Sequence, residues 1–400
     1  MDFDLIISGG GPAGLCLARA LSGYGLRLAV VEQQPLAALE NPAFDGREIA
    51  LTQHSAQLMR TLGLWERIAP QALSPLRDAR VLNGPSPFAM VIGHGLGRHS
   101  ELGWLVSNHL IRRAAFQAVQ QSQRDHGDVT LMAGEAVASV RTDHDRAHVT
   151  LASGATLQAH LLVAADSRFS TTRRAMGIAA DLHDFGRSML VCCMTHDVSH
   201  DHAAWEWFGY GQTLALLPIN DDPATGEHRS SVVLTLPSHE IDPLVTLAPP
   251  AFNLEIARRF EQRLGVMTLA STRHAYPLVA VYPRRLVAQR FACVGDAAVG
   301  MHPVTAHGFN FGLLSIDNLA SIVRAAHATG ADIAAPAGLE RFERSQRRAT
   351  LPLYLATQLI TQLYTRDNPP ARALRTLALH VGERFTPFKR LIAASLSGGR

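Results

Sequence analysis

The chain has 400 residues, of which 47% are hydrophobic and 18% charged, and its formal net charge is +3. This composition is typical of a globular protein with ample core-forming residues, and the length exceeds that of one compact domain. The small net charge gives no support to nucleic-acid binding, so we expect no nucleic acid among its partners. Four cysteines without a C-x-x-C pair favour a reducing compartment, which we interpret as the cytoplasm.

The first 32 residues alternate a short apolar strand, a glycine turn, a helical pattern and a second apolar strand, which predicts a βαβ unit. The turn follows G-x-G-x-x-G, and an acidic residue ends the second strand 18 residues later. Such glycines let the backbone approach a pyrophosphate at a helix N-terminus, and the acidic residue accepts hydrogen bonds from a ribose. An ordinary βαβ turn is the alternative. The predicted dinucleotide site comprises Gly9, Gly11, Ala13, Gly14 and Glu32.

The middle of the chain contains two different strand patterns. Residues 134–163 read as a small antiparallel meander, and residues 188–237 as a largely antiparallel sheet that forms a second domain. Two apolar strands, "LLVAAD" and "RFACVGD", each end at an aspartate. Ligands bind at the carboxyl ends of strands in doubly wound sheets, so these aspartates are candidate site residues.

Two further motifs, "DSRFSTTRR" and "GDAAVGMHPVTAHGFNFG", complete a resemblance that runs over essentially the whole chain. The sequence resembles the flavoprotein aromatic hydroxylases typified by para-hydroxybenzoate hydroxylase, and most closely the ubiquinone-biosynthesis hydroxylases. Asp166, Ser170 and Arg173 fall on the D-G-x-x-S-x-x-R pattern, which serves FAD and pyridine nucleotide in that family. Gly295 and Asp296 fall on the G-D pattern, whose carboxylate holds the flavin ribitol.

The ubiquinone branch also carries H-P…G-x-N-x-G, which His302, Pro303, Gly308, Asn310 and Gly312 match. The segment "DGREIALTQHSAQLMRTLGLW" matches another family pattern, in which Arg47 takes the place of the cofactor-side arginine. The sequence departs from the family at three places. Ser167 replaces a glycine, Ala306-His307-Gly308 replaces Gly-Gln-Gly, and Arg112, which we count with the cofactor-binding residues, stands where glutamine is common.

The resemblance implies an α/β fold: a Rossmann-like FAD-binding parallel sheet with a β-meander, an inserted antiparallel α+β substrate domain, and C-terminal helices. On this basis residues 1–72, 98–180 and 284–350 form the FAD-binding domain. Residues 73–97 and 181–283 form the substrate domain, and residues 351–400 a C-terminal helical segment.

The resemblance also implies the activity of an FAD-dependent monooxygenase. NAD(P)H reduces FAD, O2 adds to the flavin, and a flavin hydroperoxide transfers one oxygen to the ring of a polyprenylated phenol or quinol in ubiquinone biosynthesis. Three alternatives remain open: hydroxylation of a small soluble aromatic, a related flavin reductase or dehydrogenase, and a non-catalytic flavin-holding partner of a biosynthetic complex.

A helix predicted to begin at about Asn310 would point its N-terminus at the pyrimidine edge of the flavin, where free N–H groups stabilise negative charge. We name His302, Pro303 and His307 as candidate catalytic residues. For His302 a packing role beside Pro303 is the alternative. We expect the His307 side chain within about 6 Å of the flavin ring, the range of a cation–ring contact, and a solvated loop histidine is the alternative.

Two other clusters invite a functional interpretation. The run "THDVSHDH" has metal-ligand residue types, but it reads as a solvated turn, so no metal is predicted. Trp205, Trp207 and Phe208 either line a substrate cavity or fill a core, and we expect one of them in the cavity.

A lipid-like substrate suggests a lipid-carrying or quinone-biosynthesis partner protein, or at most peripheral contact with the inner face of the membrane. The arginine-rich apolar tail, residues 371–400, is the expected contact, and packing of this helix on the FAD-binding domain is the alternative.

Overall fold

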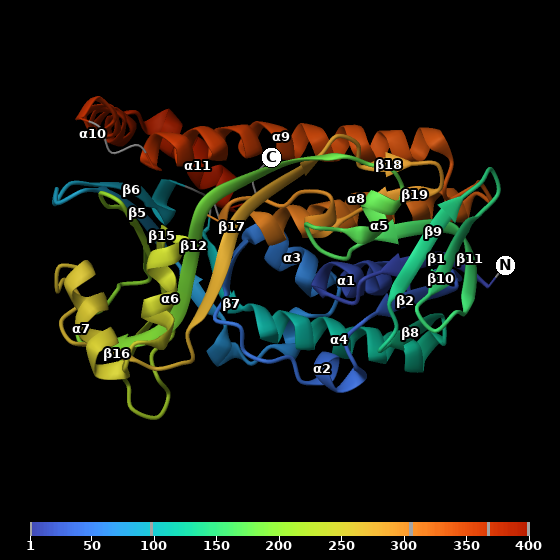
Figure 1. The fold of residues 1–400 in the computed structure, drawn as a ribbon, viewed down its shortest axis with the longest axis horizontal. Helices are drawn as coiled ribbons and strands as arrows, with labels where there is room; N and C mark the ends of the chain where they lie inside the picture. The colour runs from blue at the N-terminus through green and yellow to red at the C-terminus, as the bar shows by residue number, and fades with distance from the viewer. Residues whose placement is uncertain (1, 97–98, 304–306, 366–368, 398–400) are drawn as a thin grey trace.

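The fold is known from a computed structural model that describes residues 2–96, 99–303, 307–365 and 369–397. It contains two large β-sheets at opposite ends of an elongated molecule, with the C-terminal helices running along one side of both (Figure 1). The sheets are joined by two long strands, which pair with each other along much of their length.

The first sheet has the strand order β18-β19-β11-β1-β2-β8, with β9 and β10 extending it beside β11. Strands β19, β11, β1, β2 and β8 run parallel, while β9, β10 and β11 form the predicted antiparallel meander. The bounds are β1 (Phe3–Ser8), β2 (Leu28–Glu32), β8 (Val129–Ala133), β9 (Val137–Thr142), β10 (Ala147–Leu151), β11 (Thr156–Ala164), β18 (Val287–Ala288) and β19 (Phe291–Cys293).

The central strand β1 explains why this sheet is parallel and buried. Its residues Leu5, Ile6 and Ile7 are successive and apolar, and all three have no exposed surface. Strands covered on both faces need such continuous apolar runs rather than alternation. The covering helices include α1 (Pro12–Leu21), α4 (Asn108–His126) and α8 (Gly308–Ala328), the last beginning two residues before the predicted position.

The second sheet has the order β16-β12-β15-β14-β13-β5-β6. Strand β16 pairs with the C-terminal end of β12, and β17 pairs with the N-terminal part of β12. The sheet is largely antiparallel, as predicted, but β13 and β5 run parallel. The parallel pair arises because β5 comes from an earlier segment of the chain. The bounds are β5 (Asp78–Asn83), β6 (Ala89–Gly93), β12 (Ala180–His196), β13 (Ala203–Phe208), β14 (Thr213–Ile219), β15 (His228–Pro237), β16 (Met267–Leu269) and β17 (His274–Pro283).

Helices and a small sheet complete the fold. Helices α6 (Ser238–Thr246) and α7 (Pro249–Arg259) cover one face of the second sheet. The small sheet, β3 (Glu48–Thr52), β7 (Gly103–Ser107) and β4 (Ser74–Leu76), lies with α3 (Gln53–Thr61) near α8. The remaining helices are α2 (Leu36–Glu40), α5 (Thr171–Ala175), α9 (Pro336–Thr365), α10 (Pro369–Arg384) and α11 (Thr386–Ser397), with the 3-10 turn η4 (Gly295–Ala297).

The C-terminal helices connect the two ends of the molecule. Helix α9 packs along α8 beside the first sheet, and α10 and α11 contact β6 of the second sheet. Within the described residues, no helix is both long enough and apolar enough to cross a bilayer. The boundaries that we drew between the two domains and the C-terminal segment remain a proposal for how the chain divides.

Candidate active site

The glycine turn between β1 and α1 is packed so closely that two of its glycines are required by the fold. Gly9 has a φ of +109°, and a Cβ there would lie 2.6 Å from the carbonyl oxygen of Ala165. A Cβ on Gly14 would lie 1.9 Å from the carbonyl oxygen of Gly9. Gly11 is different, because a Cβ there would meet no atom within 4 Å. The backbone at Gly11 therefore faces open space.

The N-terminus of α1 is left uncapped at this open side. Gly11 is the N-cap residue and supplies no side chain, and Pro12 occupies the first turn. At the end of β2, the Glu32 carboxylate accepts hydrogen bonds from the backbone N–H groups of Gly10 (2.6 Å) and Gln34 (2.8 Å). A helix N-terminus without a side-chain cap attracts anions, and here an acidic acceptor lies beside it.

The G-D motif lies against the same helix turn. Gly295 has a φ of +60°, and a Cβ there would lie 2.6 Å from the Cβ of Ala13. A Cβ on Gly312 would lie 3.5 Å from the Cα of Gly295, so the first turns of α1, η4 and α8 meet. Asp296 keeps 40% of its side chain exposed and accepts a hydrogen bond from Arg168 (3.2 Å). The carboxylate is thus available at the junction of two helix N-termini.

Asp166 and Ser170 build the start of α5. The Asp166 carboxylate accepts hydrogen bonds from the hydroxyl of Ser170 and from the hydroxyl and backbone N–H of Thr172. The Ser170 hydroxyl in turn accepts from the backbone N–H of Arg173 (2.9 Å), as a helix N-cap does. Both predicted residues therefore fix the first turn of this short helix.

Arg173 ties α5 to η4. Its side chain is buried and donates to the carbonyl oxygens of Arg168 (3.1 Å) and Ala297 (3.2 Å). Burial lowers the pKa of this guanidinium, while the nearby Cys293 and Asp166 raise it. These contacts hold the loop that carries Asp296. Cofactor binding by Asp166 and Arg173 remains a prediction.

Ser167 occupies the glycine position of the family pattern in the conformation that favours glycine. Its φ is +92°, which non-glycine residues rarely adopt. The preceding residue, Asp166, accepts four hydrogen bonds from Ser170, Thr171 and Thr172, so bonds link the chain on both sides of Ser167. The substitution therefore preserves the turn and adds backbone strain.

Arg47 and Arg112 are each held by contacts with nearby side chains. Arg47 pairs with Asp45, and its guanidinium carbon lies 5.4 Å from the centre of the Tyr276 ring. Arg112, on α4, donates to the side chain of Gln34 (3.1 Å), which follows Glu32 by two residues. Asp45 and Tyr276, which orient Arg47, were not predicted from the sequence. Cofactor contact by these two arginines remains a prediction.

Asn310 fastens the N-terminus of α8. Its side-chain oxygen accepts from the backbone N–H of Thr52 (3.0 Å), and its amide nitrogen donates to the carbonyl of Ala50 (2.8 Å). Helix α8 is thereby locked to β3. His307 is the N-cap residue of α8 and is only 7% exposed, with its ring 5.7 Å from that of Phe311. The alternative of a solvated His307 is wrong for this structure.

His302 and Pro303 differ in their surroundings. The His302 ring packs edge-on against Phe185 with centroids 4.7 Å apart, and burial lowers the pKa of His302 to about 4. Its imidazole is therefore neutral at physiological pH. Pro303 is exposed. Ala306, which belongs to one of the family departures, lies outside the described residues, and the catalytic roles of His302, Pro303 and His307 remain predictions.

The histidine-rich run is a turn with exposed residues, as predicted, but two of its histidines are not solvated. His196 and His200 are each 4% exposed, and their rings lie 5.8 Å apart. Burial lowers the pKa of both. They are buried because each bonds to the ends of neighbouring strands, His196 to Ser230 and His200 to the carbonyl of Ile219. Among the described residues, no group of three or more His, Cys, Asp or Glu side chains is arranged to hold a metal.

Two of the three aromatic candidates face away from the first sheet. Trp207 is buried in the core that α6 and α7 cover, and Trp205 packs against the same core. Phe208 follows Trp207 on the strand, so it points to the opposite face. The position of a substrate among these residues remains a prediction.

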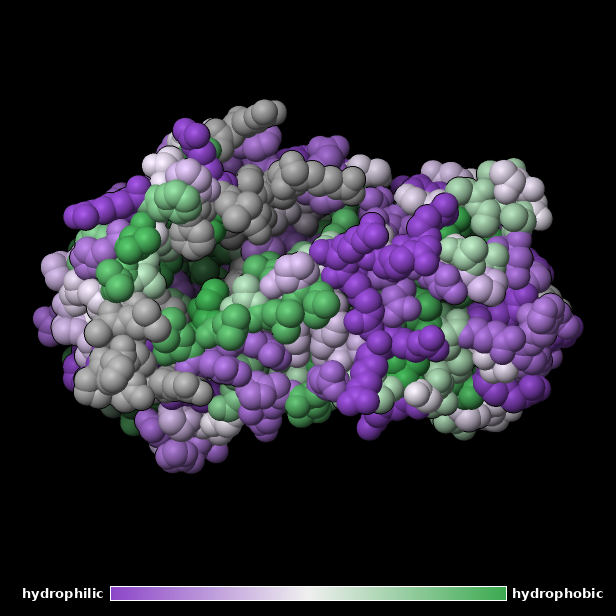
Figure 2. Space-filling view, turned by 90° about the horizontal axis from the view of Figure 1, so that it is seen from above, coloured by the Kyte–Doolittle hydropathy of each residue, from purple (hydrophilic) through white to green (hydrophobic). Residues whose placement is uncertain are grey.

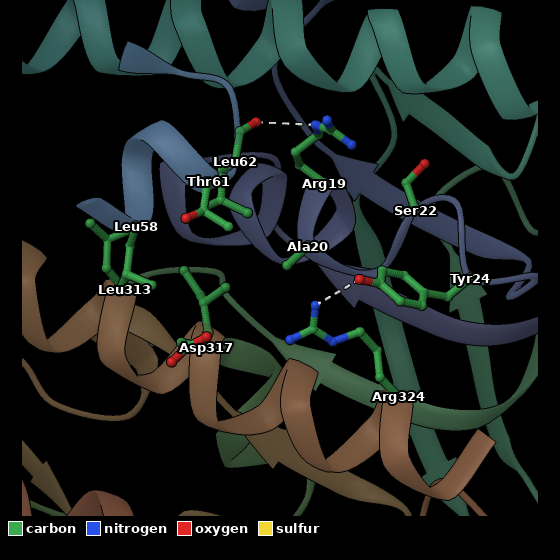
Figure 3. A pocket seen from close by; sticks show the side chains of 11 residues that line it. Arg19, Ala20, Ser22, Tyr24, Leu58, Thr61, Leu62, Leu313, Asp317 and Arg324 are labelled. Carbon is green, nitrogen blue, oxygen red and sulfur yellow. Dashed lines mark hydrogen bonds between the residues drawn. The ribbon is translucent and has the colours of Figure 1, made fainter. Parts of the chain in front are cut away.

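A separate pocket of about 230 Å³ opens between α1, α3 and α8 (Figure 3). Its two arginines are already bonded within the protein, Arg19 to the carbonyl of Leu62 and Arg324 to the hydroxyl of Tyr24. None of the predicted site residues lines it. The pocket is therefore distinct from the site formed by residues 9–14, Gly295 and Gly312, which we call the glycine cradle.

The residues at the cradle fit FAD. The open backbone at Gly11 and the uncapped N-terminus of α1 suit a pyrophosphate, and Glu32 beside them suits a ribose. Asp296 is a half-exposed acceptor suited to ribitol hydroxyls, and α8 directs its N-terminus toward the same junction. Arg168, which holds Asp296, was missed because the family pattern gives that position no signal.

We predict that two neighbouring glycine substitutions have opposite effects. Gly11→Ala should fold normally, with a stability within about 0.5 kcal/mol of wild type, because its methyl group meets no atom. It should nevertheless weaken FAD binding, since the methyl group occupies the open side of the turn. Gly14→Ala should lose at least about 1–3 kcal/mol of stability through overlap with Gly9. Thermal melts measure the stability, and FAD titration of the apoprotein measures the affinity. Equal FAD affinity for Gly11→Ala and wild type would contradict the prediction that FAD binds at this turn.

We also predict a role for His307 in the pH dependence of flavin reduction. His307→Gln should retain FAD, because both side chains are planar donors, but should flatten any pH dependence of the reduction rate that His307 causes, because glutamine does not titrate. Stopped-flow reduction by NAD(P)H measures the profile, and His327→Gln, on the last turn of α8, is the control. Identical profiles for wild type and His307→Gln would contradict the prediction.

Comparison with known proteins agrees with this site. The model of an FAD-binding domain family matches residues 2–350. Ubiquinone hydroxylase UbiM of Neisseria meningitidis is 43% identical over 399 residues, which cover 99% of this chain and 84% of the relative. Ubiquinone hydroxylase UbiL of Rhodospirillum rubrum is 33% identical over 395 residues, covering 99% and 89%.

Solved structures with low sequence identity share the fold. The p-nitrophenol 4-monooxygenase PnpA of Pseudomonas putida superposes with a TM-score of 0.77 at 18% identity, covering 99% of this chain and 98% of that chain. The anhydrotetracycline hydroxylase OxyS of Streptomyces rimosus gives 0.74 at 19% identity, covering 100% and 76%. The family model and the two ubiquinone hydroxylases, which match 99% of this chain, show that the chain belongs to the FAD-binding family of flavoprotein monooxygenases.

Proposed function

We propose that this monooxygenase hydroxylates the aromatic ring of a polyprenylated phenol or quinol in ubiquinone biosynthesis, using FAD, NAD(P)H and O2. The observation that carries the proposal is the full-length similarity to ubiquinone hydroxylases in a chain whose glycine cradle fits FAD. A small soluble aromatic is less well supported, because neither of these two relatives is named for such a substrate.

The bound flavin supplies oxygen activation once it has been reduced, and the chain supplies binding, orientation and a dry environment. The N-terminus of α1 and Glu32 would hold the nucleotide end, and Asp296 the ribitol. Helix α8, locked to β3 by Asn310, would present its N–H groups to the pyrimidine edge, where they favour negative charge. Arg173 and Asp166 would keep the Asp296 loop in place.

The neutral imidazole of His302 suits a site for an uncharged ring. Burial against Phe185 keeps it unprotonated at physiological pH, so it adds no charge to the space beside the G-D motif. Its immediate neighbours 304–306 lie outside the described residues. We therefore assign His302 a packing and orienting role and no proton transfer.

A lipid-like substrate requires access from a membrane or from a carrier, and we infer peripheral membrane contact through α9 and α10. Figure 2, which looks onto the α9 side, shows a hydrophobic band next to a strongly hydrophilic one. On α9 the exposed residues Leu351, Leu355 and Leu359 recur every four residues, so they share one helix face. On α10 the exposed Leu377 and Val381 have the same spacing.

Basic residues flank this apolar surface. The exposed Arg344 and Arg348 precede the leucines of α9, and the exposed Arg384 follows Val381 on α10. Apolar residues that enter the lipid and arginines that meet anionic headgroups are the pattern of an interfacial helix. These exposed residues extend the expected membrane-contacting surface from residues 371–400 to the second half of α9.

The proposed reaction is tested with the purified FAD-loaded protein and a short-chain 2-prenylphenol. Oxygen uptake and NAD(P)H oxidation should both depend on the phenol, and the product mass should rise by one oxygen atom. NAD(P)H oxidation without a change in product mass would favour the reductase. No turnover with any prenylated phenol or quinol would favour the non-catalytic partner.

We predict that acidic substitutions on α9 release the protein from membranes. Wild type should float with vesicles of phosphatidylcholine and phosphatidylglycerol at low salt and less at high salt, because headgroup attraction is screened. The double variant Leu355→Glu, Leu359→Glu should stay at the bottom of the gradient, since charged groups do not enter the lipid. Leu254→Glu on α7, where the leucine is 74% exposed, is the matched control. Equal flotation of the three proteins would show that α9 is not part of the membrane-binding surface.

A further inference from the structure

The two faces of the second sheet have different surroundings. On one face, residues such as Leu190, Leu216 and Leu234 are fully buried and form a core with α6 and α7. Side chains alternate between faces along a strand, so the neighbours of these residues point the other way. We call this second side the inner face. Its central members are Val191, Cys193, Ala215, Leu217, Ser231 and Val233.

The inner face meets two different neighbours. Beside Glu206 it packs against the C-terminal helices, since Val81, the partner of Glu206 on β5, clusters with Leu379 of α10 and Ala393 of α11. Gly46, which precedes β3, lies so close to β12 that a Cβ there would be 2.8 Å from a methyl carbon of Val191. Although Ala215, Leu217 and Val233 belong to central strands, they keep part of their surface accessible. Strands flanked on both sides are half-accessible only where the opposite layer does not close on them. Such partial exposure is expected where the middle of the inner face borders a recess.

Glu206 lies on this inner face. It is paired with Ala215, which is paired with Val233, which is paired with Val191, and such partners share one face of a sheet. The residue keeps some accessible surface, yet burial raises the pKa of its carboxyl to about 8. Both observations hold for a carboxyl that lines a recess within the protein.

Glu206 and Ser231 lie two strands apart on the inner face, and neither side chain has a hydrogen-bond partner within the described part of the chain. Glu206 makes no hydrogen bond or ion pair there, and the Ser231 hydroxyl, on a residue only 2% exposed, also has no partner. An unpaired buried polar group costs free energy, and one on an apolar sheet is usually replaced or bonded. Ser231 is such a group, and Glu206 is a partly accessible carboxyl without a partner on the same face, so together they indicate a ligand that contacts both.

We propose that Glu206, together with Ser231, binds the ring oxygens of the aromatic substrate and thereby orients the ring in the recess. This inference rests on the proposed function, because it names how the same site recognises its substrate. Phenols, quinols and their methoxy derivatives carry oxygens on the ring and are otherwise apolar. A mostly apolar wall with one carboxyl and one hydroxyl matches that distribution.

A carboxyl distinguishes ring hydroxyls from ring ethers. The neutral acid donates to either oxygen, whereas the carboxylate accepts only from a hydroxyl and leaves an ether unpaired. Raising the pH through the titration of Glu206 should therefore increase the preference for a phenol over its methyl ether. Glutamine donates and accepts at every pH, so it should give a constant preference.

The experiment measures binding of 2-prenylphenol and of its O-methyl ether to the FAD-loaded protein, by tryptophan fluorescence, between pH 6 and 9. In wild type the ratio of the two affinities should rise by about tenfold or more, the effect of one charge-assisted hydrogen bond. In Glu206→Gln the ratio should be constant, and in Glu206→Leu it should fall toward one. Glu240→Gln, an exposed carboxyl on α6 at the opposite face, should behave as wild type.

Thermal melts provide a second readout that needs no ligand. An acid whose pKa is raised by folding loses stability as the pH rises from its unfolded value through its folded value, here from about 4.5 to about 8. The melting temperature of Glu206→Gln should therefore exceed that of wild type by a margin that grows with pH. A constant margin, or an affinity ratio that changes with pH equally in wild type and Glu206→Gln, would overturn the assignment. Absence of any hydroxylated product from wild type would instead reject the proposed function.

Discussion

The contact between three nearly side-chain-free turns determines the geometry of the rest of the molecule. Gly9 and Gly14 let α1 begin directly against the end of β11, and Gly295 lets η4 approach Ala13. Gly312 then brings α8 to the same point. Because the contact is made by backbone, no side-chain rearrangement can relieve an added methyl group. The positions of Glu32 and Asp296, which come from distant parts of the sequence, follow from this one contact.

The second sheet uses the alternation of its strands to serve two different purposes. One set of side chains joins α6 and α7 in a closed hydrophobic core. The other set forms the inner face, which packs partly against α10 and α11 and includes polar residues that an ordinary core would exclude. A single strand such as β13 therefore stabilises the domain through Trp207 and carries Glu206 on its inner face. The alternation of side chains thus places the residues that stabilise the domain on one face of the sheet and the residues that we propose bind substrate on the other.

Much of this arrangement was predictable from the sequence, because its signals are local. The glycine turn, Glu32 and the apolar run of β1 predicted a parallel sheet and a nucleotide site, and the G-D motif predicted the position of Asp296. The burial of His196 and His200 was not predictable, since it depends on Ser230 and Ile219, which are remote in sequence. Likewise, nothing local shows that Arg168 holds Asp296 or that Glu206 points inward. Long-range pairing decides these positions.

The backbone of Ser167 has a consequence for how this chain can vary. A serine at a φ of +92° costs about 1–3 kcal/mol, which glycine would largely avoid. The hydrogen bonds of Asp166 offset this cost, so the loop keeps its shape without the residue that it most easily accommodates. This strain therefore already lowers the free energy of unfolding. A further destabilising substitution in the loop would then unfold it more readily. A chain with serine at this position therefore tolerates fewer additional substitutions than a chain with glycine.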